Sequence, residues 1–390
     1  MSKLETSAEL MKIGQLLGIK NSTELAFLEQ LPLSELIKLR TLTTDKLFND
    51  GRKLFQKLAS ASKLMPLGIT ASIGEKVFGA MLCARIASEM PYQRAIDLSQ
   101  KMSVPFLAKV TLELDPRRVK DIIQNMPLDK MRAVAKELLA QKNFMIMGGF
   151  VGFMKPDNLK TILNDVADEE ALLHIGFFIE EKHIVSNIMR MLPKERLRKL
   201  ITYMRHHKDL WPESLALMVH IEDDLKREMG DIAAAEHEVV LDDLIQTVHR
   251  LSLWQDALPL FACMSPNTQY KVINVPSMQQ HDVLQATVLH TAQYDLWSTL
   301  LPLIEYMTPT QRQILAQVVA EQEVNLLNHI ITVAYQQHLW QPLFDLLAAM
   351  SDAAQQQTAP ILHKLLATEG QLQQKWQPLI EARQLGHLFV

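Results

Sequence analysis

The sequence predicts an all-α protein arranged as an α-solenoid, in which helical repeats stack end to end. The strongest sign is a Leu-Trp dipeptide that recurs every 43 residues, at Leu210-Trp211, Leu253-Trp254, Leu296-Trp297 and Leu339-Trp340. A fixed period of this size is typical of stacked helical repeats. Composition agrees, because only 13 of the 390 residues are glycine and good helix formers such as Leu, Ala, Gln, Lys and Glu dominate.

One 43-residue unit, read from Val283, predicts three helices. The first runs to about Gln293, a turn follows at 295–297, the second helix ends near Met307, and the third begins at Pro309. Three helices in a unit of this length resemble armadillo and HEAT repeats in period. One large side chain per unit is what a layered core requires. The repeat core is therefore predicted to contain Trp211, Trp254, Trp297 and Trp340.

These patterns divide the chain into four regions. Residues 1–90 are predicted as an N-terminal helical region, 91–193 as looser helix pairs, 194–365 as four 43-residue three-helix repeats, and 366–390 as a C-terminal capping helix. Proline suits the first turn of a helix, where its missing N–H would have no partner anyway. Six prolines are predicted to begin amphipathic stretches in this way: Pro91, Pro105, Pro116, Pro127, Pro156 and Pro193.

A repeated theme joins an apolar residue, a polar residue, proline and then spaced aliphatic residues. It occurs at Leu114-Asp115-Pro116 and in a similar form at Leu192-Pro193-Lys194-Glu195. In this theme residues 106–201 resemble the helical N-terminal cytoplasmic domain of MgtE-type magnesium transporters. A flagellar motor-switch protein with a right-handed helical superstructure is similar in shape. The resemblance implies a right-handed superhelix and nothing about magnesium, because no transmembrane region is recognised in this sequence.

Charge is distributed unevenly along the chain. Residues 1–208 carry 32 basic and 23 acidic side chains, whereas residues 209–390 carry 8 and 21, which gives the net charge of −4. Residues 251–360 contain only two basic side chains, Lys271 and Arg312. One interpretation is a solvated surface that keeps the protein soluble. The others are an anionic partner at the basic half, or head-to-tail pairing of the two halves in a homo-oligomer.

Motifs that carry chemistry are absent from the sequence. It contains no glycine-rich phosphate loop, Cys-x-x-Cys pair, His-Glu-x-x-His or Gly-x-Ser-x-Gly. His220 and His237 have acidic neighbours, but adjacent residues on a helix point in different directions and chelate a metal poorly. Cys83 and Cys263 lie in apolar stretches and are predicted to be buried free thiols in a reducing compartment. We therefore predict a cytoplasmic protein with no enzymatic activity, cofactor or metal site.

The densest basic stretch lies at residues 190–208. It defines a candidate partner-binding basic face made of Arg190, Lys194, Arg196, Arg198, Lys199 and Arg205. An acidic protein or peptide partner, or an anionic membrane surface, fits these charges. The net charge of −4 and the lack of interleaved aromatic residues for base stacking argue against nucleic acid.

Two further segments leave alternatives open. Residues 52–65 predict an amphipathic helix that either packs on its neighbours or lies on an anionic membrane. Its apolar and basic residues are Leu54, Phe55, Leu58, Ala61 and Met65, and Lys53, Lys57 and Lys63. Residues 144–154 lack charge but are shorter than the ~20 residues of a membrane span. Gly148 and Gly152 in this segment predict close helix packing, with a hinge or ligand-facing gap as the alternative.

Methionine is abundant, with 20 residues. Its flexible thioether fills irregular core gaps and also lines adaptable binding sites. We predict a non-enzymatic scaffold or adaptor that binds a protein or peptide through a groove or charged face. The alternative is a small-molecule or lipid-like ligand in an apolar pocket lined by Met and Phe. An open groove with a polar rim would favour the first function, and a closed cavity with a few convergent polar groups the second.

Overall fold

The computed structural model describes residues 3–19, 22–236, 238–322, 324–368 and 371–389. These residues form α-helices joined by short turns, 3-10 helices and one π-helix, with no β-strand among them. The all-α prediction is therefore confirmed for the described chain. Packing divides the chain into two compact units, which we call the N-unit (Met1–Tyr203 with Pro212–His220) and the C-unit (Met204–Trp211 with Ile221–Val390).

The N-unit begins with a helical hairpin. Its helices are α1 (Lys3–Leu17), the 3-10 helix η1 (Ser22–Leu28) and α2 (Leu33–Asn49). Leu10 and Ile13 of α1 pack with Leu25 and Leu36 in a small core of their own. Burial of these four aliphatic side chains gives the hairpin a local driving force to form.

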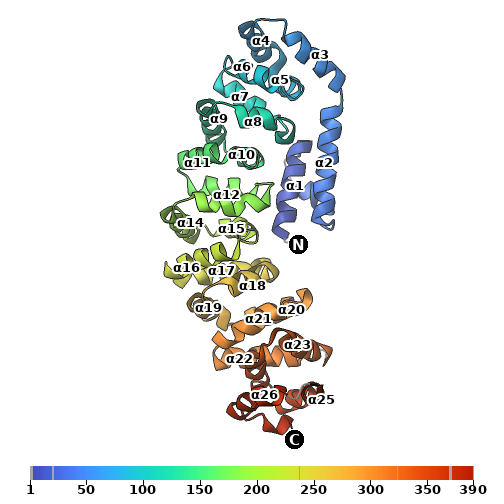
Figure 1. Cartoon of the computed structure of the whole chain (residues 1–390), viewed down its shortest axis with the longest axis vertical. Helices are drawn as coiled ribbons and strands as arrows, with labels where there is room; N and C mark the ends of the chain where they lie inside the picture. Colours follow the sequence, from blue (N-terminus) through green and yellow to red (C-terminus); the bar gives the residue numbers. More distant parts are fainter. Residues whose placement is uncertain (1–2, 20–21, 237, 323, 369–370, 390) are drawn as a thin grey trace. The chain divides into compact units, whose positions relative to one another are not determined.

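A series of short helices completes most of the N-unit (Figure 1). They are α3 (Arg52–Ser62), α4 (Leu67–Ile73), the π-helix η2 (Gly74–Phe78), α5 (Gly79–Ser88), α6 (Tyr92–Ser99), α7 (Val104–Leu112), η3 (Pro116–Arg118), α8 (Lys120–Asn125), α9 (Leu128–Ala140), α10 (Phe144–Val151), α11 (Pro156–Asp165), α12 (Glu169–Phe177), η4 (Lys182–Ile184) and α13 (Val185–Met191). Two helices contain residues of both units, α14 (Lys194–His206) and α15 (Trp211–Met218), and η5 (Lys208–Leu210) between them belongs to the C-unit.

Helices of the N-unit pack on the helix two places further along the chain. One row joins α3 to α5, α7, α9 and α11 in turn, and other contacts join α4 to α6, α6 to α8, and α10 to α12. This pairing is what short amphipathic helices produce when each buries an apolar stripe between its neighbours.

The predicted prolines stand at helix starts, with one difference. Pro91 and Pro127 directly precede α6 and α9, and Pro156 is the first residue of α11. Pro116 instead begins the 3-10 turn η3, so that α8 starts only at Lys120. The buried carboxylate of Asp115 accepts a hydrogen bond from the backbone N–H of Arg117 at 3.1 Å, which holds the tighter turn.

The C-unit contains the strict repeats. Its helices are α16 (Asp223–Ala235), α17 (Glu238–Leu251), α18 (Trp254–Cys263), α19 (Pro266–Ile273), η6 (Pro276–Gln279), α20 (His281–Tyr294), α21 (Trp297–Leu303), η7 (Ile304–Tyr306), α22 (Pro309–Ala320), α23 (Val324–Gln337), α24 (Trp340–Ala348), α25 (Asp352–Thr368), α26 (Gln371–Ala382) and η8 (Gly386–Leu388). Three helices per 43 residues are therefore present, as α20, α21 and α22 illustrate. Residues 366–390 begin with the end of α25 and continue as α26 and η8.

A backbone motif recurs at the same period. Ser252, Asp295 and His338 have positive φ angles of 55°, 53° and 56°, and each ends the first helix of a repeat. The next backbone N–H then returns to a carbonyl five residues earlier, the hydrogen bond of a Schellman cap. These bonds are Leu253 to Val248 (2.9 Å), Leu296 to Thr291 (3.0 Å) and Leu339 to Ala334 (2.9 Å). The Leu of each Leu-Trp pair thus closes one helix, and the Trp begins the next.

The tryptophans of the repeats are buried. Trp254 and Trp297 have exposed fractions of 0%, and Trp211 and Trp340 of 5% and 8%. Their helices also stack, because α18 contacts α21 and α21 contacts α24. Past the last repeat, Trp376 packs on Trp340 with ring centroids 5.0 Å apart. The indoles of Trp254, Trp297 and Trp340 are therefore buried where successive repeats of the C-unit pack on one another.

Candidate functional site

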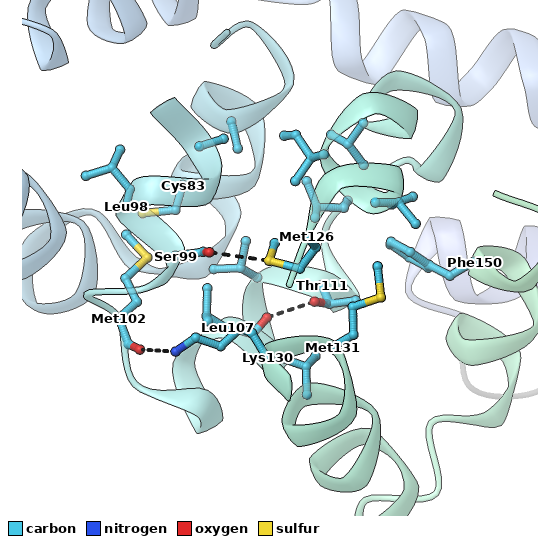
Figure 2. A pocket seen from close by; sticks show the side chains of 18 of the residues that line it. Cys83, Leu98, Ser99, Met102, Leu107, Thr111, Met126, Lys130, Met131 and Phe150 are labelled. Atoms are coloured by element: carbon cyan, nitrogen blue, oxygen red, sulfur yellow. Dashed lines mark hydrogen bonds between the residues drawn. The ribbon is translucent and has the colours of Figure 1, made fainter. Parts of the chain in front are cut away.

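The N-unit contains an apolar cavity of about 270 Å³ that is partly open to solvent. Side chains from α3 through α11, together with Ile175 of α12, line it. The lining comes both from the row α3, α5, α7, α9 and α11 and from the helices α4, α6, α8 and α10, and Figure 2 shows part of it. For comparison, an apolar cavity of ~150 Å³ is enough to hold a benzene molecule.

Most of the cavity wall is hydrocarbon and thioether. Only six of its lining residues carry a hydroxyl, thiol or amine: Ser62, Thr70, Cys83, Ser99, Thr111 and Lys130. Nine others are methionine or phenylalanine: Met65, Met90, Met102, Met126, Met131, Met147, Met154, Phe78 and Phe150. Unbranched thioether chains can adjust to occupants of different shape. The wall therefore suits an apolar ligand better than a polar one.

Two hydroxyl groups of the wall donate hydrogen bonds to neighbouring backbone carbonyls. Ser99 Oγ donates to the carbonyl of Ile96 at 2.6 Å, and Thr111 Oγ1 donates to that of Leu107 at 2.9 Å. Each bond stays within one helix, a common use of Ser and Thr in helices. These hydroxyls are therefore poorly placed to act as nucleophiles.

Lys130 is the exception among the polar groups. It is the only residue with a full charge among those that line the cavity, all of which lie in the described chain. Its Nζ donates a long hydrogen bond of 3.4 Å to the carbonyl of Met102, as Figure 2 shows. An ammonium group has three N–H donors. No carboxylate of the described residues forms a salt bridge with it within 4.0 Å, so Lys130 places a positive charge at an apolar wall.

Cys83 lies in the same wall as an unreactive thiol. Burial raises its pKa to about 11, so the thiol is neutral at physiological pH. Since the thiolate is the nucleophilic form, Cys83 is a poor nucleophile. Cys263 of the C-unit is also a free thiol, and burial followed by a hydrogen bond to Asp223 raises its pKa. The prediction of two free thiols is confirmed, although both side chains are half-buried rather than fully buried.

Glycine allows the helices at one side of the cavity to approach closely. A Cβ atom added to Gly148 of α10 would lie 2.6 Å from the carbonyl oxygen of Ile175 in α12. A Cβ added to Gly152 would lie 2.6 Å from Cγ of Glu181. Real Cβ atoms do not approach other atoms so closely, so α10 and α12 can pack at this distance only without side chains here. The prediction of close packing at these glycines is confirmed.

A set of charged side chains, most of them half-buried, fastens the N-terminal hairpin to the rest of the N-unit, and we call it the latch cluster. Its members are Glu5, Glu9, Lys12, Arg40, Glu180, Lys182 and His220. Arg40 pairs with Glu9 and, at 3.0 Å, with Glu180 beyond the end of α12. His220 Nε2 lies 2.6 Å from Glu5 Oε1, and this hydrogen bond lowers the pKa of the Glu5 carboxyl.

Lys182 is the member of the latch cluster whose pKa is shifted most. Burial, followed by repulsion from Lys12, lowers its pKa to about 8. Its Nζ donates to the carbonyl of Phe177 at 3.0 Å. Perturbed lysines occur at catalytic sites and also in structural ion networks. Here the neighbours are other charged side chains of the hairpin contact, which indicates a structural role.

The candidate basic face has mixed surroundings. Arg190, Lys194, Arg198 and Lys199 are exposed, and Arg198 forms an ion pair with Glu195 at 3.3 Å. Arg205, half-buried, belongs to the C-unit. Arg196 differs, because its guanidinium contacts Glu169 at 3.1 Å and donates to the carbonyl of Val166 at 2.6 Å. Arg196 therefore holds α14 to α12 within the N-unit and is not displayed for a partner.

Within the described residues, no group of three or more His, Cys, Asp or Glu side chains is arranged to hold a metal ion. His220 instead pairs with Glu5, and His237 lies outside the described residues.

One helical stretch has the length and composition of a membrane span. It is Leu67–Ser88, with 22 residues and a mean hydropathy of 1.3 in its most apolar window, 17% of which is buried. A single stretch of this kind is weak evidence for a transmembrane helix. Sequence reading missed it, because Gly74, Glu75 and Lys76 interrupt the apolar residues.

Comparisons with protein-family models, with curated proteins and with solved structures each found no match. The resemblance of residues 106–201 to MgtE-type transporters, and that of residues 194–365 to armadillo and HEAT repeats, therefore stay predictions.

Proposed function

We propose that the protein is a binding protein whose N-unit holds an amphipathic ligand, a hydrocarbon chain with an anionic end. The observation that carries this proposal is the 270 Å³ apolar cavity with Lys130 in its wall. The volume is nearly twice that of the ~150 Å³ cavity that holds benzene, which suits a chain of about ten carbons. Of the two functions considered from sequence, the alternative, a lipid-like ligand in a Met- and Phe-lined pocket, is the better supported.

The anionic end follows from the chemistry of Lys130. Lys130 is half-buried, and no described carboxylate forms a salt bridge with its ammonium group. The carbonyl of Met102, at 3.4 Å, satisfies the ammonium only in part. A carboxylate on the ligand would accept a charge-assisted hydrogen bond, the stronger kind in proteins. We therefore expect medium-chain carboxylates to bind more tightly than the corresponding alcohols.

Binding without catalysis is the simpler function for this cavity. Ser99 and Thr111 donate to carbonyls of their own helices, and Cys83 holds its proton because its pKa is about 11. A nucleophile needs a base or a lowered pKa to react. The free thiols also agree with a reducing, cytoplasmic location, which we include in the proposal.

Calorimetric titration of the full chain with decanoate and with decanol tests the anionic end. Lys130→Met is expected to weaken decanoate binding by ~10–100-fold, the value of a hydrogen bond to a charged group. Decanol binding is expected to change little. Lys136→Met is the matched control, because Lys136 is exposed on the same helix and does not line the cavity. Equal loss of decanoate and decanol affinity would contradict the role of Lys130.

A second pair of variants tests the cavity itself. Ala135→Phe places a ring where Ala135 lines the space and should lower decanoate affinity at least about tenfold, because the chain and the ring compete for the same volume. Ala140→Phe, at the exposed end of the same helix, should bind as the parent does. Undiminished binding by Ala135→Phe would show that the chain binds elsewhere.

A scaffold function of the C-unit is the second candidate. We propose that its repeats continue as an α-solenoid with an acidic surface for a basic protein or peptide. Both basic side chains of residues 251–360 are hydrogen-bonded to backbone carbonyls: Lys271 Nζ donates to that of Ala234 at 2.8 Å and Arg312 donates to that of Glu305 at 3.0 Å. Affinity capture on the full chain is expected to retain basic proteins that salt releases. Retention of acidic proteins alone would contradict it.

A further inference from the structure

Exposed apolar side chains are concentrated near the N-terminus. Among the described residues, 13 of the 19 large hydrophobic side chains that are exposed lie within residues 1–81. Five of them follow one another from α3 to α5: Leu54 (58% exposed), Leu64 (89%), Ile69 (54%), Val77 (73%) and Met81 (56%). Single exposed apolar residues are ordinary, but these lie on elements that pack against one another, since α3 and η2 both contact α5 and α4 contacts η2. Such a group indicates an interaction surface.

Lysines accompany this apolar group. Lys53, Lys57, Lys63 and Lys76 are exposed, and no salt bridge within the described part of the chain involves them. Arg52 is the nearby exception, because it pairs with Glu89 at 2.7 Å. Within residues 51–88 the only acidic residue is Glu75, which accepts hydrogen bonds from the Oγ and the backbone N–H of Ser103. The segment therefore carries uncompensated positive charge.

The same helices also line the cavity. Leu58 of α3, Met65 after it, Ile73 of α4 and Phe78 of η2 belong to the cavity wall. The amphipathic stripe predicted for residues 52–65 is thus divided, with Leu58 and Met65 at the cavity and Leu54 exposed to solvent. In Figure 1 the helices α3, α4 and α5 lie together at one end of the N-unit.

We propose that this end of the N-unit docks on an anionic membrane surface. The docking surface consists of Leu54, Leu64, Ile69, Val77 and Met81 with Lys53, Lys57, Lys63 and Lys76. Apolar side chains among lysines are the composition of interfacial segments, in which the apolar groups enter the acyl boundary and the lysines meet anionic headgroups. A protein partner would have to be both apolar and acidic over the same area, whereas an anionic bilayer presents anionic headgroups above an apolar acyl region over its whole surface.

Docking at the interface fits the packing better than spanning does. Within the Leu67–Ser88 stretch, Ala84 is 0% exposed and Ile86 is 7% exposed. The guanidinium of Arg85 lies 3.7 Å from the ring centre of Phe48, at the end of α2. Insertion across a bilayer would break these contacts, and docking leaves them intact. The inference goes beyond ligand binding in the cavity and does not depend on it.

Flotation of the full chain with lipid vesicles tests the proposal. We expect binding to equimolar phosphatidylcholine–phosphatidylglycerol vesicles, little binding to pure phosphatidylcholine, and release by high salt. Changing Lys53, Lys57 and Lys63 to Gln should weaken binding ~100-fold, on the usual contribution of each lysine near an anionic surface. The control changes Lys120, Lys136 and Lys160 to Gln; these are exposed on α8, α9 and α11 and should have a much smaller effect.

A separate variant tests the apolar part. Leu64→Ser with Val77→Ser should reduce binding at low salt, and because both side chains are mostly exposed, its circular dichroism melt should match the parent. Three results would overturn the proposal: equal binding to both vesicle types, equal effects of the two lysine sets, or bound protein that resists both salt and alkaline carbonate, which would mean insertion. Decanoate titration of the same variants is expected to be unchanged, so failure here is distinguishable from failure of the ligand proposal.

Discussion

Replacing Gly148 by alanine should destabilise the N-unit, and the structure gives the size of the effect. The new Cβ would lie 2.6 Å from the carbonyl oxygen of Ile175 and 2.9 Å from the backbone carbon of Phe178. Both are backbone atoms, so α10 and α12 must separate. Overpacking of this kind costs ~1–3 kcal/mol. Alanine recovers up to ~1 kcal/mol through its higher helix propensity.

Gly149→Ala is the matched control for Gly148→Ala. A Cβ at Gly149 would find its nearest neighbour, Cγ of Pro116, at 4.0 Å, which is an ordinary contact. This variant should therefore keep the propensity gain of up to ~1 kcal/mol without the strain. The two free energies of unfolding should differ by the overpacking term of ~1–3 kcal/mol, with Gly148→Ala the less stable.

Thermal unfolding of the two glycine variants can be assigned to the correct unit. Four of the five tryptophans, at positions 254, 297, 340 and 376, lie well inside the C-unit, whereas Trp211 directly precedes Pro212 of the N-unit. Fluorescence therefore reports mainly on the C-unit, while far-UV circular dichroism reports on both units. A difference of ~1–3 kcal/mol corresponds to a shift of ~2–12 °C for a unit of about 200 residues. The shift should be clear in the dichroism transition and much smaller in the fluorescence transition. Equal melting of Gly148→Ala and Gly149→Ala would refute the close approach of α10 and α12.

Three other perturbations have definite expected outcomes. Lys182 loses its proton near pH 8 in the folded protein and near pH ~10.4 in the unfolded chain, so the unfolded chain binds more protons between these values. The free energy of unfolding should therefore rise with pH in this window, by at most ~1.4 kcal/mol per pH unit relative to Lys182→Met. Urea unfolding followed by circular dichroism measures it. Trp297→Ala should cost ~3–5 kcal/mol by the same measurement and Trp297→Phe clearly less; a parent-like melt of the alanine variant would place the indole at the surface. Arg196→Ala should lower stability because it leaves Glu169 unpaired, whereas Lys199→Ala should be neutral; equal melts would show that the Glu169 contact contributes nothing.

The repeats of the C-unit could be predicted from the sequence because the patterns that produce them lie within a few consecutive residues. Each repeat joins a residue with positive φ, which the Schellman cap needs, to a following Leu and a Trp that begins the next helix, and all three fall within a few residues, as at Asp295, Leu296 and Trp297. Proline at the start of the third helix, as at Pro309, is equally local. Stacking only requires that such a unit be copied at a constant period.

The sequence offered the cavity only as an alternative and did not locate it, because its signals are not local. Met102, Met126 and Met131 have the helical spacing of core residues whether the core closes or leaves a space, and no local pattern distinguishes the two. Lys130 looks in sequence like any lysine on the polar side of an amphipathic helix. The bond between Arg196 and Glu169, 27 positions earlier, is likewise invisible without the fold. Non-local packing decides all three.

The cavity is also costly for a protein that needs only a stable shape. Without an occupant, its apolar wall either meets water or lacks packing partners, and both states cost free energy. Larger side chains at positions such as Ala95 or Ala135 would remove much of that cost. Small residues kept at this wall, next to flexible methionines and one ammonium, are what a site requires when an occupant supplies the missing contacts.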